Sequence, residues 1–587
     1  MSSSPSDSSS TPSNSSSSSK RPIDPVLRNA LRYTVSAKEY KLLHDYLISK
    51  SAAVEKRAPK PKRYEALVKS TEDYNVATVR VSLRVFIAAF TGLKGWEFLS
   101  KKLLERKQKA TRYASRINAT PKIMTTNRSK LPVAPANSSA LRISASFSLI
   151  LLFHRLLHRF FIRLRASLLE ESAKAFRYRN PRITEALTSR FTPILGASLA
   201  GFWLQLCPKS QMRMTIAIYM FTRSLEFSYN AAEEKGIWGK RGKPDWVGSW
   251  MIMPLAYGQL LHSFVFDRDC FPSGFSEFIL KRSPEYIQTR PAGLPAYAKW
   301  PGTFDIVDAL AQLSRLKWPA FTSPILFPQK EHPLPISLSS IAPITGSAHP
   351  LIQHTSCALL HPSDPSCART YLKYFLSAFP TTARFFTAFY GAFALLSYKA
   401  FLANPAQTLN RLASRILRMT LFITGAVGTS WGSICLFANY LPKGFLSTQR
   451  WFLGGLLGGM WAYVARRGER SNFLYCARLS IDSLWKVGVK HGWWKGFKSG
   501  DVFVFVASLA LLNIVYEARP RAVRGSVIRK GLGVVRGDGW VDRVVTVGAA
   551  TEKKADDVEK EILEKSEEIV EESNEIIERS EELRKDE

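Results

Sequence analysis

The sequence has few cysteines and lacks two common catalytic motifs. Only 6 of its 587 residues are cysteine, which excludes the disulfide framework of a small secreted protein. The phosphate-binding P-loop and the zinc-protease motif HExxH are both missing. The Ser-rich start of the chain looks like neither a secretory signal nor an arginine-rich presequence. We therefore expect a protein that is not an enzyme and whose targeting information is internal.

Acidic residues are scarce outside one segment. The chain carries a formal net charge of +35, yet residues 551–587 contain 16 acidic and 7 basic residues. Basic clusters elsewhere, such as Lys101–Lys109 and Arg519–Arg529, border apolar runs. This placement is typical of loops beside membrane helices and of contact with anionic lipid. It argues against a nucleic-acid partner, because no aromatic stacking surface is interleaved with the basic residues.

Long uncharged runs predict an all-α, multi-pass transmembrane helical bundle. Val247–Phe266 contains 20 residues without Asp, Glu, Lys or Arg and is the clearest span, and Thr420–Tyr440 and Phe191–Pro208 are similar runs. About 20 apolar residues, at about 1.5 Å each, cross the hydrocarbon core of a bilayer. Ser146–Phe161 is interrupted by His and Arg, so it either spans the membrane or lies in its interface. Shorter apolar runs lie at residues 85–93, 385–398, 451–465 and 502–516.

Composition divides the chain into five segments. Two membrane units are separated by a linker rich in Pro, Ser and His, and each end of the chain has a polar tail. The acidic tail repeats a seven-residue pattern that predicts a charged helix, and a coiled coil that binds a protein partner is the alternative. The segments are a disordered Ser-rich tail at 1–30, a first membrane unit at 79–300, the linker at 301–366, a second membrane unit at 367–530 and the acidic tail at 551–587.

The two membrane units share sequence patterns that indicate an internal duplication. The pattern Leu-Gly-x4-Gly-x-Trp occurs at residues 195–203 and again at 453–461. Each copy is followed by a Tyr and an Arg on one predicted helix, at residues 219–223 and 475–478. An apolar run then closes each unit. We therefore expect the bundle to consist of two related repeat units.

A glycine-rich helix in each unit predicts close helix packing. Glycines four residues apart form a flat helix face, which a neighbouring helix can approach closely. Packing within the chain is the favoured interpretation, and contact with a second copy, with a partner helix or with a pore is the alternative. The glycines concerned are Gly196 and Gly201 in the first unit and Gly454, Gly455, Gly458 and Gly459 in the second.

The helix after each glycine-rich segment contains an acid–base pair among apolar residues. Arg223 and Glu226 are three residues apart, and Arg478 and Asp482 are four apart, so each pair shares a helix face. Ionisable groups at membrane depth face the bundle interior or a water-filled cavity. We expect intramembrane ion pairs with a structural role, and a polar path for a substrate is the alternative.

One short segment contains several candidate metal ligands. His354, Cys357, His361 and Cys367 lie within fourteen residues of the chain. Their side chains are of the types that bind Zn²⁺. However, the spacing lacks the paired Cys-x2-Cys of many zinc sites, and the segment is rich in Pro and Ser. A loop without a cofactor is therefore the favoured interpretation, and zinc binding is the alternative.

Further motifs are spread over both halves of the chain. They comprise Cys207–Trp238, Trp250–Gln259 and Cys270–Lys281 in the first half, and Pro365–Cys367, Gly454–Gly459, Arg466–Glu469, Tyr475–Trp493 and Gly500–Val504 in the second. These motifs resemble the fungal branch of the transmembrane protein 135 family. That family is distantly similar to the channel subunits of the mitochondrial inner-membrane translocase and to a small peroxisomal membrane protein. The resemblance includes no catalytic residues.

The resemblance implies a location and a class of function. It implies an integral protein of an organelle membrane, peroxisomal in the first place and mitochondrial in the second, whose partner is the lipid bilayer. The expected role is in peroxisomal or mitochondrial membrane function, lipid homeostasis or the passage of solutes. The alternative is a membrane-anchored tethering scaffold that recruits partners through its polar tails.

Overall fold

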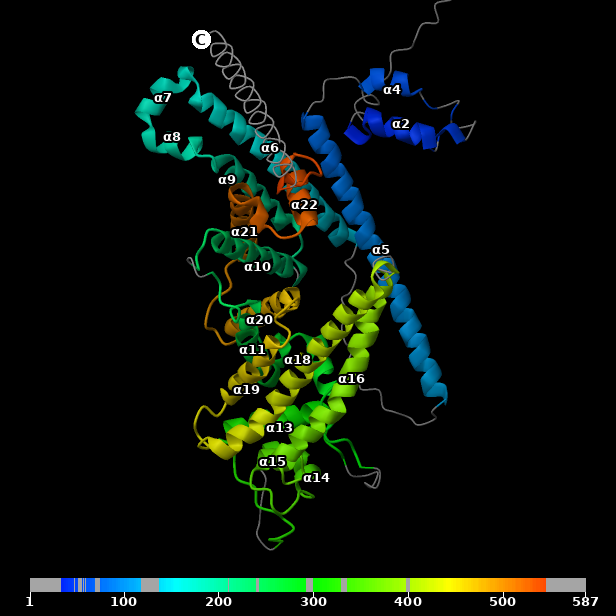
Figure 1. Ribbon diagram of the computed structural model, residues 1–587, viewed down its shortest axis with the longest axis vertical. Coiled ribbons are helices and arrows are strands. Elements are labelled where there is room, and N and C mark those ends of the chain that lie inside the picture. The colour runs from blue at the N-terminus through cyan, green and yellow to red at the C-terminus, as the bar shows by residue number, and fades with distance from the viewer. Residues whose placement is uncertain are drawn as a thin grey trace, which may run out of the picture. The chain divides into compact units, whose positions relative to one another are not determined.

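The computed structural model describes most of residues 33–544 (Figure 1). The described residues are helical, and their β-structure is limited to one isolated bridge between Ala320 and His354. The predicted all-α class is thus confirmed for this part of the chain. The two expected tails, at 1–30 and 551–587, lie outside the described residues. Also outside them are residues 31–32, 47, 51–54, 56–57, 59, 69–73, 118–136, 210, 239–241, 292–298, 329–334, 397–401 and 545–550.

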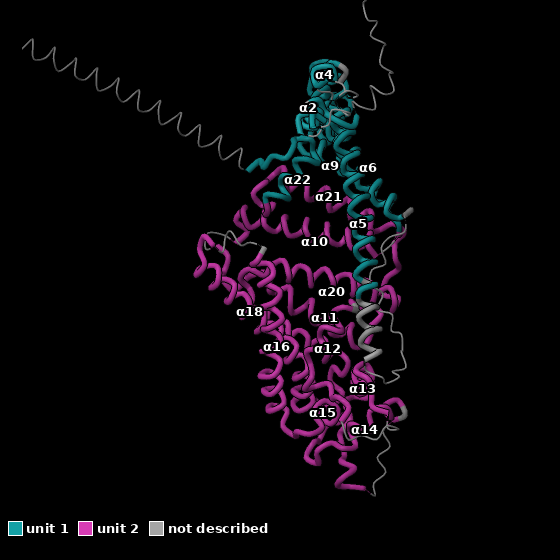
Figure 2. Tube along the Cα trace, turned by 90° about the vertical axis from the view of Figure 1, so that its right-hand side faces the viewer, with its two compact units in different colours: residues 1–120, 134–208, 526–587 teal, residues 121–133, 209–525 magenta. Residues whose placement is uncertain are grey.

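The helices form two compact units (Figure 2). This division differs from the two membrane units expected from composition, because helices from both halves of the sequence pack together in unit 2. Unit 1 comprises residues 1–120, 134–208 and 526–587, and unit 2 comprises residues 121–133 and 209–525.

Unit 1 is built on two long helices, α5 (Tyr74–Ile117) and α6 (Asn137–Leu169), which pack against each other. The last described helix, α22 (Ser526–Arg536), packs on α6. There the guanidinium of Arg155 donates a 2.9 Å hydrogen bond to the carbonyl of Val534, which joins residues 379 positions apart. The other elements of unit 1 are α2 (Ala37–Tyr46), η1 (Ile48–Lys50), α4 (Pro61–Val68), η2 (Glu171–Ala173), α7 (Lys174–Arg179), α8 (Pro181–Thr188), α9 (Thr192–Ser198) and η3 (Leu199–Leu206).

Unit 2 contains the remaining helices. They are α10 (Gln211–Glu234), η4 (Ser249–Met251), α11 (Ile252–Phe266), η5 (Arg268–Cys270), α12 (Ser273–Lys281), α13 (Thr303–Arg315), η6 (Ile336–Ile341), α14 (Ala342–Thr345), α15 (Thr355–Leu360), α16 (Cys367–Leu396), α18 (Pro405–Tyr440), α19 (Arg450–Gly459), η7 (Met460–Tyr463), α20 (Arg470–Lys490), α21 (Gly500–Ala518) and η8 (Pro520–Ala522). Helix α16 packs on α18, α18 on α19, α19 on α11 and α11 on α20, while α10 packs on α21. Helix α18 also packs on α15, and this contact brings one of its side chains to the site described below.

Four helices of the described part are long and apolar enough to cross a membrane. They are residues Tyr74–Leu103 of α5, residues Ser139–Leu169 of α6, and the whole of α18 and α21. Helices α18 and α21 contain two of the apolar runs identified in the sequence, and α5 and α6 extend two runs that were short or interrupted by charge. Membrane-type helices therefore occur in both units.

The run expected to be the clearest span, Val247–Phe266, forms a shorter helix. Helix α11 has 15 residues and follows the 3-10 turn η4, so at about 1.5 Å per residue it is about 22 Å long, less than the roughly 30 Å of a hydrocarbon core. Ten of its 15 residues are buried within the protein. Its lack of charge thus reflects a protein core. The run Phe191–Pro208 is likewise divided, into α9 with 7 residues and η3 with 8.

The segment expected as a linker, residues 301–366, contributes to the core of unit 2. It contains α13, η6, α14 and α15. Leu310, Leu338, Ile344 and Leu359 from these elements are fully buried and belong to one apolar cluster with residues of α11 and α18. Most of these helices are too short to give a helical period in the sequence, which is why composition alone indicated a linker.

The glycine-rich helix α19 lies between α11 and α18. A Cβ atom on Gly455 would lie 2.7 Å from the Cα of Gly258 in α11, and one on Gly458 would lie 2.7 Å from the carbonyl oxygen of Ala426 in α18. Both glycine faces are therefore occupied by helices of unit 2, as close helix packing requires. The other predicted glycines pack in the same way or are buried: Gly454 faces Ser433, Gly459 faces Pro254, Gly196 faces Phe161 and Gly201 is buried in η3.

Candidate metal centre

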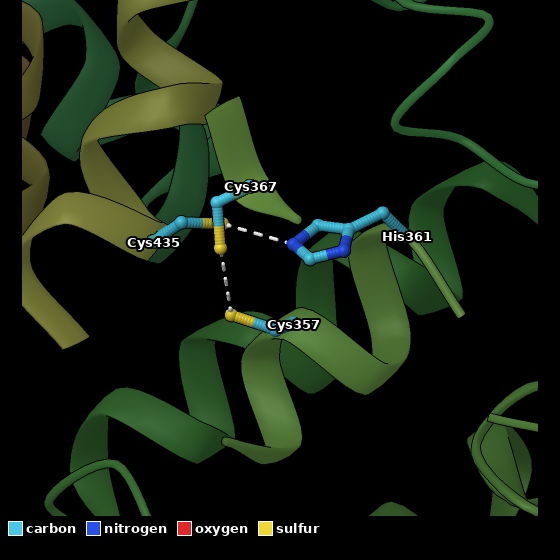
Figure 3. Close-up of side chains that lie close together, drawn as sticks. All are labelled: Cys357, His361, Cys367 and Cys435. Carbon is cyan, nitrogen blue, oxygen red and sulfur yellow. Dashed lines mark hydrogen bonds between the residues drawn. The ribbon is translucent and has the colours of Figure 1, made fainter. Parts of the chain in front are cut away.

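Four side chains that can bind a metal meet in unit 2 (Figure 3). Cys357 lies in α15, His361 follows that helix directly, Cys367 begins α16, and Cys435 lies near the end of α18. The sulfur atoms and the nearest ring nitrogen all lie within 4.8 Å of one another. Three stretches of the chain thus converge on one point.

Local structure directs these side chains to a common side. Cys357 lies in α15 and His361 comes directly after that helix, four positions on, so the two side chains are about one helical turn apart on the same side. In the turn that follows, the carboxylate of Asp364 accepts a 2.9 Å hydrogen bond from the backbone N–H of Ser366, immediately before α16 begins at Cys367. Helix α18 packs against both α15 and α16 and supplies the fourth donor.

Two distances between the donors match those of a tetrahedral zinc site. With Zn–S near 2.3 Å and Zn–N near 2.0 Å, two sulfurs lie about 3.8 Å apart, and a sulfur and a nitrogen about 3.5 Å apart. The Sγ atoms of Cys357 and Cys367 are 3.8 Å apart. The Sγ atom of Cys435 lies 3.4 Å from Nε2 of His361. All six cysteines of the chain are free thiols, so no disulfide joins the donors. The two distances instead leave room for a cation between them.

A backbone carbonyl orients the imidazole of His361. Nδ1 of this ring donates a hydrogen bond of 2.7 Å to the carbonyl oxygen of Asp364. A carbonyl oxygen only accepts, so Nδ1 carries a proton, and Nε2 faces the sulfur atoms. A metal that binds at Nε2 would displace the proton that this nitrogen carries in the charged ring. Metal-binding histidines are commonly held in this way by a partner behind the ring.

The electrostatics of the centre favour negative charge on sulfur. Burial alone lowers the pKa of His361, but hydrogen bonds with the thiols of Cys357 and Cys367 outweigh it and raise that pKa to about 10. Hydrogen bonds from Cys357 and Cys435 hold the pKa of Cys367 far below its usual range, although burial opposes this. The thiolate is the form of cysteine that binds metal. A cation at the centre would therefore be stabilised by the negative charge of the Cys367 thiolate.

The centre is enclosed by protein. Cys357, His361 and Cys435 have at most 3% of their surface exposed, whereas Cys367 is half-buried. Three cysteines and one histidine fill all four corners of a tetrahedron and leave no corner for water or a substrate, as in structural zinc sites. The surrounding apolar cluster includes Tyr286, Tyr374 and Trp431.

The structure brings together three of the four ligands considered from the sequence, and His354 is the exception. His354 precedes α15, its backbone pairs with Ala320, and its imidazole interacts with Asn439. Cys435 takes its place. Spacing along the chain could not reveal Cys435, because it lies in a different apolar run. The one available signal was a cysteine near the end of an otherwise uncharged segment.

The first of the expected acid–base pairs forms part of a larger cluster. Arg223 donates a 2.6 Å hydrogen bond to the carboxylate of Glu226, and Arg470 of α20 lies 3.0 Å from the other oxygen of that carboxylate. Neither α10 nor α20 is among the four candidate spans. These charges therefore lie on helices packed within unit 2, and they join α10 to α20.

The second expected pair does not form. Asp482 binds Lys486 at 2.6 Å and accepts hydrogen bonds from Gln211 instead. The guanidinium of Arg478 lies over the rings of Tyr219 and Tyr475, at 4.9 and 5.9 Å from their centroids. A shared helix face made the ion pair feasible, but aromatic neighbours on α10 and α20 compete for the arginine.

Two comparisons with known proteins, one by sequence family and one by structure, give no match. No family model matches the sequence, and no solved structure matches the fold. The residues of the centre and the apolar helices are therefore the basis for a functional proposal.

Proposed function

We propose that the protein is a multi-pass organelle-membrane protein without enzymatic activity. We also propose that zinc stabilises unit 2. The zinc ligands are Cys357, His361, Cys367 and Cys435. The observation that supports this most directly is the enclosed set of four donors beside a candidate span, α18. A zinc ion with four protein ligands has a structural role, because no position remains for substrate.

The zinc would fasten the segment before α16 to the end of α18. The turn from His361 to Cys367 carries two of the donors, and Cys435 belongs to a long helix in the core of unit 2. A site that exists only in the folded chain contributes its binding free energy to folding. Zinc therefore stabilises α15 and the start of α16 against α18.

We also propose that the chain consists of two related repeats. Helices α9 and η3 on one side, and α19 and η7 on the other, both change from α to 3-10 geometry within the repeated Leu-Gly pattern. Each is preceded by a pair of long packed helices, α5 with α6 and α16 with α18. Each is followed by two helices that pack across the halves, α10 on α21 and α11 on α20. In both cases a helix that follows the first Leu-Gly pattern packs on a helix that follows the second. This matching arrangement supports a duplication.

The resemblance to the transmembrane protein 135 family supports a peroxisomal or mitochondrial membrane and a role in lipid homeostasis or solute passage. The tethering alternative depends on the two tails, which lie outside the described residues. Carbonate extraction and co-localisation of the tagged protein with peroxisomal and mitochondrial markers test the location. Release of the protein by carbonate, or its absence from both organelles, would contradict the proposal.

Metal analysis of the purified full-length chain tests the zinc centre. We expect zinc in equimolar amount with the protein, and a lower melting temperature in detergent after a strong chelator has removed it. Re-addition of zinc should restore the melting temperature. Intact thiols without any metal, or a disulfide between Cys357 and Cys367 in the native protein, would overturn the proposed centre.

A further inference from the structure

We propose that a pocket lined by arginines on α18 binds a phosphate group. The pocket has a volume of about 390 Å³ and is lined by Arg411, Arg415 and Arg418 of α18 and by the turn that precedes α20, with Arg467, Gly468 and Glu469. All of these residues belong to unit 2. The pocket is separate from the metal centre, since Arg418 and Cys435 are 17 positions apart in sequence, or about 25 Å along the helix.

The arginines of the pocket share one side of α18. Positions 411, 415 and 418 are spaced by four and three residues, which places them on a single helix face. Arg467 approaches from the turn before α20. In this turn Gly468 has a backbone φ of +95°, a conformation that side chains disfavour and that glycine adopts readily. The turn thereby places Arg467 and Glu469 beside the face of α18.

The pocket has a positive charge that its own acid does not balance. Among the lining residues, Glu469 has the one carboxylate. This carboxylate forms an ion pair with Arg415 at 2.6 Å and accepts a 2.6 Å hydrogen bond from the side-chain amide of Asn472. Arg415 is held further by the ring of Tyr390, 4.5 Å from its guanidinium. Within the described residues, Arg411, Arg418 and Arg467 have no ion-pair partner. Three free guanidinium groups therefore face a pocket with no remaining negative charge.

The number and type of these groups favour a phosphate. Guanidinium groups donate two parallel hydrogen bonds to phosphate oxygens, and three of them suit a dianion with three free oxygens better than a single carboxylate. The helix that begins at Arg470 adds the positive end of its dipole at the same place. The shape and charge thus indicate a phosphomonoester.

The position along α18 allows two sources for this phosphate. The uncharged run Thr420–Tyr440 is about 31 Å long, close to the roughly 30 Å of a hydrocarbon core. The three arginines of α18 lie directly before it, at the depth expected for lipid headgroups. The phosphate is therefore the monoester headgroup of a lipid such as phosphatidic acid, or that of a soluble phosphomonoester.

Binding by the full-length protein tests the proposal in two arms. In detergent, glycerol 3-phosphate is titrated by calorimetry. In nanodiscs, retention of phosphatidic acid is compared with that of a fatty acid, which has a carboxylate in place of the phosphate. The variant R411Q/R418Q/R467Q removes the three free arginines. The control K174Q/R179Q/R182Q removes the same charge from exposed positions on α7 and α8.

We expect wild type and control to bind the phosphate compound in at least one arm, and the pocket variant to bind it at least about tenfold more weakly at an unchanged melting temperature. Binding of glycerol 3-phosphate would identify a soluble ligand, and binding of phosphatidic acid alone would identify the headgroup. No preference for phosphate in either arm, or equal losses in the two variants, would overturn the proposal. Zinc content is measured on the same samples, so failure here is distinguishable from failure of the metal centre.

Discussion

The Sγ atom of Cys435 lies 3.4 Å from Nε2 of His361, although 74 residues separate the two in sequence. Helix α18 brings Cys435 to the end of α15, where two further thiols complete a four-donor set. Without Cys435 the remaining three donors would leave one corner of a tetrahedron open, as in catalytic zinc sites. This one contact therefore decides between an open centre and a closed one.

Cys435→Ser should lower zinc affinity, whereas His354→Ala should leave it unchanged. Serine is a poor zinc ligand, and loss of a ligand should weaken binding by more than the roughly 10- to 100-fold seen for second-shell changes. His354 lies beside the centre without being a donor. Zinc content is measured after dialysis against a weak chelator, together with the melting temperature.

A matched control is Cys476→Ser, which alters another free thiol of unit 2 that is not part of the centre. It should retain zinc. Loss of zinc in the His354→Ala variant, or full zinc content in the Cys435→Ser variant, would show that the donor set is not the one described.

The helical class and much of the membrane pattern could be predicted from the sequence. Thr420–Tyr440 belongs to a helix that qualifies as a span, because its uncharged length matches a bilayer. Val247–Phe266 has the same composition, yet it forms the short buried helix α11. Lipid and a protein core are both apolar, so composition alone cannot distinguish them. The length of the helix, and not its burial, distinguishes the two runs, because 72% of the apolar window of α18 is also buried within the protein.

The candidate site could be predicted only in part, for a related reason. Cys357, His361 and Cys367 lie close in sequence, so their spacing gave a signal. Cys435 reaches them through the packing of α18 on α15, which no local pattern records. The Arg478–Asp482 pair failed for the opposite reason: spacing allowed it, but Lys486 and aromatic rings provide other partners.

Gly459→Ala should destabilise the protein, and Gly391→Ala should not. A Cβ atom on Gly459 would lie 2.5 Å from the Cα of Pro254, so α19 and α11 would have to separate, at a cost of about 1–3 kcal/mol. Gly391 lies in α16 with no atom within 4 Å of an added Cβ, and alanine there should add about 0.5–1 kcal/mol through helix propensity. Unfolding in detergent with urea gives both values. Equal effects of the two changes would contradict the close approach of α19 and α11.

Asp501→Asn should cost about 3–5 kcal/mol, because it leaves Arg213 buried without its counter-charge. The guanidinium of Arg213 donates two hydrogen bonds to the carboxylate of Asp501, one of them 2.9 Å long, and both side chains are at least 90% buried. The pair fastens α10 to the start of α21. The double change R213Q/D501N should cost less than Asp501→Asn alone, since no lone charge remains. A double variant that is less stable than the single one would mean that the pair itself supplies most of the stability.

The stability that Asp267 contributes should disappear in acid. Its side chain is 4% exposed, and its carboxylate lies 2.9 Å from Nζ of Lys490 and 3.0 Å from Nε2 of His491. Burial alone would raise the pKa of Asp267, but these two partners outweigh it and lower the pKa below its ordinary value of 3.8.

A lowered carboxyl pKa stabilises the folded state above the unfolded pKa, and this stability is lost as the pH falls through the folded value. At neutral pH, Asp267→Asn should therefore be less stable than wild type by about 1–3 kcal/mol. The difference should shrink once the pH falls below about 3.8. Asp245→Asn, at an exposed position, should match wild type throughout. A stability difference between Asp267→Asn and wild type that stays constant from neutral pH into acid would contradict this, because only titration of the carboxylate makes it depend on pH.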